Sequence, residues 1–241
     1  MKFLQERKFD LSIFAISDLH LSFKSDKPMD IFDGWEDYVD RLRKNWKKNI
    51  KNEDTVVIAG DISWAISLRE SFDDFCFLQS LPGKKIIMRG NHDYWWSTKR
   101  KVEMFLKENE LSSIFVLHNS AISIGDYCIC GARSWMYPAK SPEDEKILKR
   151  EIGRLRISVD LAIKTNLTPI VFLHYPPICG FDVNKEIINI LLENKIKECY
   201  FGHVHGKSAL GRVFLGKYKG IYFKLLSADS LGFNPVEIKC F

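Results

Sequence analysis

The sequence predicts an α/β protein in which two packed mixed β-sheets are flanked by helices, a four-layer α-β-β-α sandwich. Two observations predict this class. Short apolar runs bounded by polar residues or glycine alternate with amphipathic segments early in the chain, and hairpin signals follow later. The chain has 241 residues, of which 46% are hydrophobic and 28% charged, so we expect residues 1–241 to form a single domain.

Four apolar runs are predicted to be strands, because they are too short for helices and read as buried on both faces. They are residues 11–17, 55–59, 85–88 and 170–173. Segments with apolar residues at helical spacing are predicted to be helices, namely residues 33–52, 67–78 and 143–164.

Two hairpins are expected in the second half of the chain. Gly125-Asp126 is a two-residue turn signal between residues 122–124 and 127–130. Residues 216–220 form the expected loop between strands at 212–215 and 221–226. Hairpins that follow an alternating βα pattern indicate mixed sheets.

The charge balance is mild. The 36 basic residues exceed the 31 acidic ones, and a net charge of +5 favours anionic substrates only weakly. No apolar run approaches the ~20 residues of a membrane span, and residues 1–10 lack the apolar core of a secretory signal. The six cysteines include no CxxC pair, so we expect reduced thiols and a cytoplasmic protein, with Cys128 and Cys130 as small buried side chains on one side of a strand.

Five short polar segments each follow a predicted strand. They are Asp18-Leu19-His20, Gly60-Asp61, Gly90-Asn91-His92-Asp93, His174 and Gly202-His203-Val204-His205. Five of the six histidines of the chain lie in these segments. Because loops at the carboxyl ends of strands in α/β sheets converge on binding crevices, we expect these side chains to form one site.

The residue types indicate a metal centre. Aspartate, histidine and asparagine without a thiolate suit borderline divalent cations such as zinc, manganese or iron. The seven candidate ligands, more than one such ion needs, are Asp18, His20, Asp61, Asn91, His174, His203 and His205. Because a carboxylate can bridge two cations, the count indicates a dinuclear centre with ions ~3.5–4 Å apart.

The five segments, in this order over residues 18–205, resemble the calcineurin-like metallophosphoesterase superfamily. In the family pattern each position has an implied role. The first cation is implied to bind Asp18, His20 and His205, and the second Asn91, His174 and His203, with Asp61 as the bridge. The resemblance also implies the two-sheet sandwich that the periodicity predicts.

The resemblance implies that His92 binds no cation. Instead His92 contacts the phosphate and protonates the leaving oxygen, with Asp93 as its orienting partner. Asn91 and His92 are candidate substrate contacts, and so is Arg133, for which a surface ion pair is the alternative.

The function implied is hydrolysis of a phosphomonoester or phosphodiester with two divalent cations, manganese, iron or zinc, as cofactor. In this hypothesis the cations lower the pKa of a bridging water, and the resulting hydroxide attacks phosphorus in line. The two ions and His92 stabilise the charge that develops on the phosphoryl oxygens. A small phosphoester is the expected substrate, and nucleic acid is the alternative.

Two other functions stay open. A nuclease acting on single-stranded nucleic acid is suggested by adjacent Trp95 and Trp96, of which one is expected in the core and the other in the cleft, and by a basic run. That run, otherwise expected to be a solvated helix face, comprises Arg41, Arg43, Lys44, Lys47, Lys48 and Lys51. The second alternative is a non-catalytic metal-binding scaffold, against which the complete ligand set and His92 argue.

Two features lie outside this pattern. His118, in a turn-like stretch, is expected to be a surface or hydrogen-bonded polar histidine. The loop of residues 24–34 beside the first polar segment is a candidate substrate-selecting flap.

Overall fold

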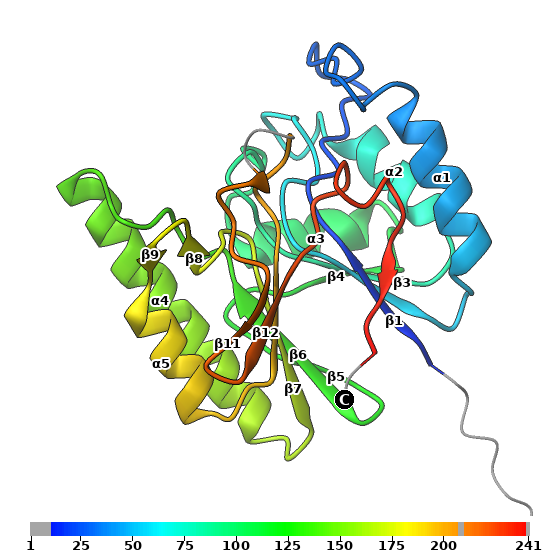
Figure 1. Cartoon of the computed structure of the whole chain (residues 1–241). Helices are drawn as coiled ribbons and strands as arrows, with labels where there is room; N and C mark the ends of the chain where they lie inside the picture. Colours follow the sequence, from blue (N-terminus) through cyan, green and yellow to red (C-terminus); the bar gives the residue numbers. More distant parts are fainter. Residues whose placement is uncertain (1–10, 207–209, 240–241) are drawn as a thin grey trace, which may run out of the picture.

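Two β-sheets pack face to face, and helices cover the outer face of each sheet (Figure 1). The computed structural model describes residues 11–206 and 210–239. The predicted α/β class with two mixed sheets between helices is confirmed. Residues 1–10 and Cys240 lie outside the described residues, so the expectations about a secretory signal and about that thiol stay predictions.

The first sheet has five strands in the described part of the chain, in the order β13-β1-β2-β3-β4. Their bounds are Ile13–Ile16 for β1, Thr55–Ile58 for β2, Lys84–Ile87 for β3, Ile114–Val116 for β4 and Val236–Glu237 for β13. Strands β1 to β4 run parallel, and β13 pairs antiparallel with β1 at the edge. The carboxyl ends of four strands therefore meet at one edge of this sheet.

The second sheet has the order β11-β12-β10-β7-β6-β5 among the described residues. The bounds are Ile122–Ile124 for β5, Tyr127–Ala132 for β6, Thr168–Leu173 for β7, Glu198–Phe201 for β10, Gly216–Tyr218 for β11 and Ile221–Leu225 for β12. Strands β6, β7, β10 and β12 run parallel, and the edge strands β5 and β11 run antiparallel to their neighbours. A small separate hairpin pairs β8 (Ile178–Cys179) with β9 (Asp182–Val183).

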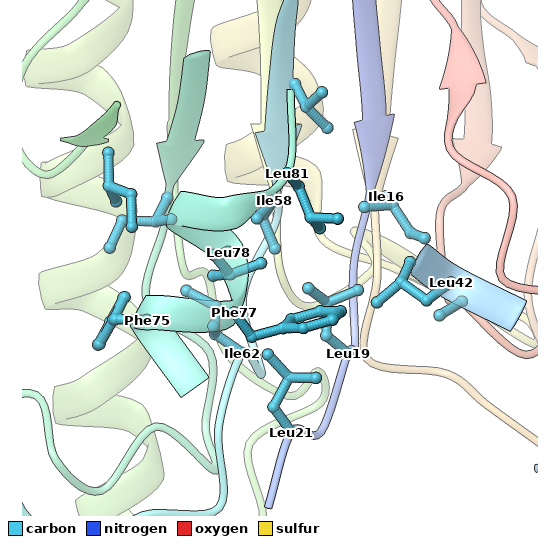
Figure 2. Close-up of a cluster of buried hydrophobic side chains, with 14 of the residues drawn as sticks. Ile16, Leu19, Leu21, Leu42, Ile58, Ile62, Phe75, Phe77, Leu78 and Leu81 are labelled. Atoms are coloured by element: carbon cyan, nitrogen blue, oxygen red, sulfur yellow. The ribbon is translucent and has the colours of Figure 1, made fainter. Parts of the chain in front are cut away.

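Among the described residues, three helices cover the first sheet and two cover the second (Figure 1). The first three are α1 (Tyr38–Asn49), α2 (Phe72–Ser80) and α3 (Lys99–Glu108), and the other two are α4 (Pro142–Ile163) and α5 (Lys185–Glu193). Figure 2 shows part of the core beneath α1 and α2, where Leu42 and Leu78 lie with Ile16 and Ile58 of the strands.

Strand β1 shows why the strands read as unbroken apolar runs. Its side chains alternate between two cores: Ile13 and Ala15 pack between the sheets, whereas Phe14 and Ile16 pack under the helices. All four residues are buried, since a strand in the middle of four layers has no solvent face.

Several predicted boundaries are wrong. The helix predicted at 33–52 begins at Tyr38, because Asp37 has φ 49°, which a right-handed helix does not accept. The helix predicted at 67–78 begins only at Phe72. Helices α3 and α5 were not predicted, and α5 illustrates the reason. Its nine residues are rich in Ile and Leu, and a short apolar run of this kind cannot be distinguished from a strand by periodicity.

The two hairpins have different outcomes. The first is confirmed, because β5 and β6 pair across Gly125-Asp126, with Ile124 opposite Tyr127. In the second, the predicted strand at 212–215 is wrong: the strand is Gly216–Tyr218, and the turn is Lys219-Gly220. Both turn residues have positive φ, 48° and 86°, as a tight two-residue hairpin turn requires.

The expectation for Cys128 and Cys130 is confirmed, since both are fully buried in the core between the second sheet and its helices. Across the described ranges, the helices are all too short or too polar to cross a membrane. The compartment stays a prediction.

Lys85 is a fully buried lysine in β3. Its ammonium group donates hydrogen bonds to the carbonyl oxygens of Leu81 at 2.5 Å and Gly83 at 2.8 Å, and to Oγ of Ser113 at 3.0 Å. Leu81 is the C-cap residue directly after α2, so the lysine satisfies a carbonyl that the helix leaves unpaired.

We expect the substitution Lys85→Ala to lower the free energy of unfolding by about 3 kcal/mol, because it opens a cavity and leaves buried carbonyl oxygens unpaired. Equilibrium chemical denaturation measures this loss. Lys85→Met is the matched control, because it restores the aliphatic stem without the donors and should recover only part of the stability. Unchanged stability of Lys85→Ala would show that these hydrogen bonds contribute nothing.

Candidate metal centre

The carboxyl edges of the two sheets bring the five polar segments together. In the first sheet they follow β1, β2 and β3, and in the second they follow β7 and β10. Direct contacts join the sheets here: for example, Asp61 lies 3.4 Å from His174, and the backbone N–H of His203 donates to the carboxylate of Asp18 at 2.9 Å. The expected convergence of these residues on one site is therefore observed.

One compact group consists of Asp18, His20 and Asp61, whose potential ligand atoms all lie within 4.8 Å of one another. Nε2 of His20 is 3.8 Å from Oδ2 of Asp61. The Asp18 carboxylate also accepts hydrogen bonds from the hydroxyls of Ser17 at 2.5 Å and Ser227 at 2.9 Å. These bonds hold the carboxylate in place, and all three members of the group are buried.

A second group consists of Asp61, His174 and His203, also within 4.8 Å. The side-chain oxygen of Asn91 joins it, at 2.7 Å from Nε2 of His174 and 2.8 Å from Nδ1 of His203. Nδ1 of His174 lies 3.0 Å from the carbonyl oxygen of Ala59 and donates its proton there. Because Nδ1 is committed to that bond, Nε2 is the ring nitrogen directed at the group, as in many metal-binding histidines. Against the effect of burial, the nearby carboxylates of Asp61 and Asp18 raise the pKa of His174 to about 9, so a cation bound at Nε2 would displace a proton.

Asp61 belongs to both groups. Its Oδ1 accepts the backbone N–H of His92 at 2.8 Å. Its Oδ2 is buried, faces His20 on one side and His174 on the other, and has no hydrogen-bond partner among the described residues. A carboxylate oxygen placed in this way is suited to bridge two cations.

The residues present fit a divalent cation. Nδ1 and Nε2 of His20 and Oδ2 of Asp61 are buried without a hydrogen-bond partner in the described part of the chain. A buried polar atom left unpaired costs about 1–3 kcal/mol, and a cation would satisfy it. Carboxylate, imidazole and amide oxygen are ligands of manganese, iron and zinc.

The electrostatics leave the rings of His20 and His203 with lone pairs available to a cation. Burial lowers the pKa of His20 and of His203 to about 3, so both rings are neutral at physiological pH. Burial raises the pKa of the Asp61 carboxyl, but attraction to the charged ring of His174 outweighs this effect and lowers the pKa below its usual value. Asp61 is therefore ionised.

The backbone of the site is strained. Asp18, His20, Asp61 and His203 have positive φ values of 56°, 47°, 51° and 70°. Such values are uncommon for residues with a side chain, although Asp and His tolerate them better than most, and they cluster at functional sites. A Cβ atom on Gly90 would overlap Asp61, so the approach of the two loops requires glycine at that position.

His205 lies beside the first group but outside its 4.8 Å limit. Its ring centroid is 5.2 Å from that of His20 and 6.1 Å from that of Trp35. It is partly exposed, unlike the other members of that side of the site.

His92 also lies next to the first group, with its ring centroid 5.6 Å from that of His20. Nδ1 of His92 is buried without a hydrogen-bond partner in the described residues. Asp93 therefore does not orient the ring through that atom.

Asp93 instead organises the main chain around the site. Its buried carboxylate accepts the backbone N–H groups of Asp61, Ile62, Ser63 and Gly90 and the indole N–H of Trp95. Burial and the neighbouring Asp61 raise the pKa of Asp93 to about 6, against the effect of these donors. These contacts are those of a residue that orders the main chain of a turn.

Sequence reasoning missed Trp64. Its ring stacks on His20 at a centroid distance of 4.8 Å and meets His92 edge-on at 4.4 Å. Its indole N–H contacts Sδ of Met29 at 3.3 Å, which anchors the loop of residues 24–34 beside the site. The available signal was a tryptophan three positions after Asp61, in the loop that follows β2.

The expectation that Trp95 or Trp96 lines the cleft is wrong. Both are buried in the core under the helices, at 2% and 3% exposure. Trp95 packs edge-on against Phe75, and Trp96 packs against His118. Tyr94, at 57% exposure, is the aromatic side chain of this segment that reaches solvent.

The other predicted features lie around the site. Arg133 makes an ion pair with Glu151 at 3.4 Å, but both side chains are buried, so the pair is not a surface one. His118 is partly buried, and burial lowers its pKa to about 4. Of the basic run, the exposed members are Lys44, Lys47, Lys48 and Lys51, as expected for a solvated face.

The chain is similar to several solved structures, and the first of those described next agrees with the fold. Among solved structures, the protein TT1561 of Thermus thermophilus shares 12% identity, covers 95% of this chain and 98% of its own, and has a TM-score of 0.56. AQ665 from Aquifex aeolicus, a protein of unknown function, shares 17% identity over 95% of this chain and 96% of its own, with a TM-score of 0.44. Purple acid phosphatase PPD1 from yellow lupin (Lupinus luteus) seeds shares 12% identity over 81% of this chain and 38% of its own, with a TM-score of 0.39.

No curated protein matches the chain significantly. The family model of calcineurin-like phosphoesterases, however, matches residues 11–207. This span includes every one of the five polar segments that meet between the sheets. The chain therefore belongs to the calcineurin-like phosphoesterase family.

Proposed function

We propose that this protein is a metal-dependent phosphoesterase with two divalent cations, manganese, iron or zinc, bound side by side. The observation that carries the proposal is the position of Asp61, whose unpartnered Oδ2 faces both groups of ligand-type side chains within the described residues. A single-cation site has no need of a second group that shares the same carboxylate.

The two groups divide the ligands. The first cation would be held by Asp18, His20 and His205, the second by Asn91, His174 and His203, and Asp61 would bridge them. Bound there, the cations supply an activated water and neutralise charge on a phosphoryl group.

His92 acts on the substrate rather than on the cations. Because its Nδ1 is buried, Nε2 is the ring nitrogen available to the substrate. It would donate a hydrogen bond to the phosphate and pass its proton to the leaving oxygen as the bond from phosphorus to that oxygen breaks. Trp64 holds the ring edge-on, in place of a hydrogen-bonded carboxylate. Asn91 is adjacent and is also proposed to contact the substrate, whereas a substrate contact by Arg133 stays a prediction.

Asp93 is proposed as a positioning residue. It acts on His92 and Asp61 through the main chain, because its carboxylate binds the N–H groups of Gly90 and Asp61. It therefore holds the loops after β2 and β3 at the spacing that the two groups require.

A nuclease is the second candidate. The exposed lysines of the basic run favour an anionic polymer, but the burial of Trp95 and Trp96 removes the aromatic surface that suggested base stacking. A small phosphomonoester or phosphodiester is therefore the preferred substrate class.

We expect phosphoesterase activity only in protein reconstituted with manganese, iron or zinc, and its loss when a chelator removes the metal. The measurement is a screen of phosphomonoesters, phosphodiesters, nucleotides and single-stranded nucleic acids at physiological salt, with His92→Ala as the blank. Activity confined to nucleic acid would select the nuclease. Protein that holds two equivalents of metal yet is inert on the whole panel would be a scaffold.

The variants His92→Ala and Asp61→Asn should differ in metal content. We expect His92→Ala to keep both cations and lose at least ~100-fold in kcat, because it removes only a proton donor. Asp61→Asn should lose metal as well as activity, because the amide is a poor bridge. Elemental analysis of the purified variants checks the division, and equal metal loss in both would contradict it.

The substitution Asp93→Asn should weaken metal binding or activity by about 10–100-fold, because it loosens the loop that carries Asp61. The matched control is Asp74→Asn. Asp74 is another buried aspartate that ties loops, through Phe23 and Ser63, but it bonds neither Asp61 nor Gly90. Metal titration and thermal melting of both variants distinguish a positioning role at the metal centre from a purely structural one. The control Asp74→Asn should lose thermal stability only. Equal metal affinity in the two variants would overturn the positioning role of Asp93.

A further inference from the structure

A small cavity lies beside the metal centre, on the side of β4 in the first sheet and of β6 in the second. It is enclosed by the ends of β3 and β6, the loop after β4 and helix α4, and its polar lining includes Arg89, His118, Arg133, Glu151 and Arg154. Its volume is about 10 Å³. This is close to the space that one water molecule or an ion of similar size occupies.

The lining carries more positive than negative charge. Glu151, at 1% side-chain exposure, lies 2.6 Å from Arg154, 3.4 Å from Arg133 and 3.8 Å from Arg150. Arg89 lines the same cavity and forms no ion pair within the described residues. Asp93, whose charge also acts on Arg89, does not line the cavity. In the lining itself, one buried carboxylate faces three guanidinium groups, and uncompensated buried charge is costly.

Two of these guanidinium groups have an unused donor. Nε of Arg89 and Nε of Arg133 are buried without a hydrogen-bond partner in the part of the chain that the structure describes. The side chain of Arg133 is 9% exposed, is paired with Glu151, and lies over the ring of Trp135 at 4.4 Å. It therefore cannot turn its Nε–H toward solvent without giving up both contacts.

His118 and Asn119 also line the cavity, and neither compensates the charge, since an amide is uncharged. Burial and the nearby Arg154, Arg89 and Lys99 lower the pKa of His118 to about 4, so the ring is neutral at physiological pH. A neutral imidazole beside several positively charged side chains is consistent with a positive potential in the cavity.

We propose that this cavity binds one small inorganic anion of the size of chloride, held by the Nε–H groups of Arg89 and Arg133. A water molecule would satisfy the donors but leave the charge uncompensated, and the volume is too small for a tetrahedral phosphate. The proposal goes beyond the phosphoesterase function and does not depend on it.

The position of the anion couples it to the ligand loops. Arg89 directly precedes Gly90 and Asn91, and the carbonyl oxygen of Arg133 accepts the backbone N–H of His174 at 3.2 Å. An anion between these two arginines therefore joins the ends of β3 and β6 across the seam between the sheets.

Bromide, which is similar in size to chloride and scatters anomalously, is the direct probe. Crystals of the wild-type protein grown without halide and soaked in sodium bromide should show an anomalous peak between Arg89 and Arg133. Density without an anomalous signal at that position would identify a water molecule and overturn the proposal. Because this measurement uses the wild-type protein, it does not depend on whether a variant folds.

Thermal melting provides the test in solution. At constant ionic strength, replacing gluconate by chloride should raise the Tm of the wild type by about 3 °C if chloride reaches ~10 times its Kd. Arg89→Gln should remove most of this rise. Arg150→Gln, whose side chain is 55% exposed and does not line the cavity, is the control and should keep it. Coincident melting curves in chloride and gluconate would overturn the proposal.

Discussion

The contact between Asp61 of the first sheet and His174 of the second determines the arrangement of the site. Each residue follows a central parallel strand, β2 or β7, and the two meet only because the carboxyl edges of both sheets face the same way. The same edges let Asp18 accept the backbone N–H of His203. Ligands more than a hundred positions apart in the chain are therefore held by the packing of two sheets rather than by a local motif.

This arrangement has a conformational cost. Four of the candidate ligands have positive φ values, and several of their polar atoms are buried without a partner among the described residues. Such strain persists only where the surroundings hold it in place, which here is done by the buried carboxylate of Asp93 and by Gly90, where no side chain fits. The polar atoms that the protein leaves unpaired are the ones that a cation would use.

The seam between the sheets continues beyond the metal centre into the arginine-lined cavity. Both regions place polar and charged side chains at strand ends, but the metal centre presents electron-pair donors, whereas the cavity presents positively charged groups. Over the described ranges, the ligand groups leave lone pairs of Asp61 and His20 unpaired, whereas the cavity leaves the N–H groups of Arg89 and Arg133 unpaired. The first arrangement suits cations and the second an anion, and the two lie on neighbouring strands of the same sheets.

The sequence by itself determined the fold class, most strands and the residues that meet at the site, because buried strands read as apolar runs and Asp and His at their ends are conspicuous. It did not determine that Trp95 and Trp96 are both buried, that Asp93 binds main-chain N–H groups, or that Trp64 packs on His92. Only the tertiary structure decided these points. They depend on which loops lie against each other across two layers, and contacts of that kind leave no periodic or local signal in the chain.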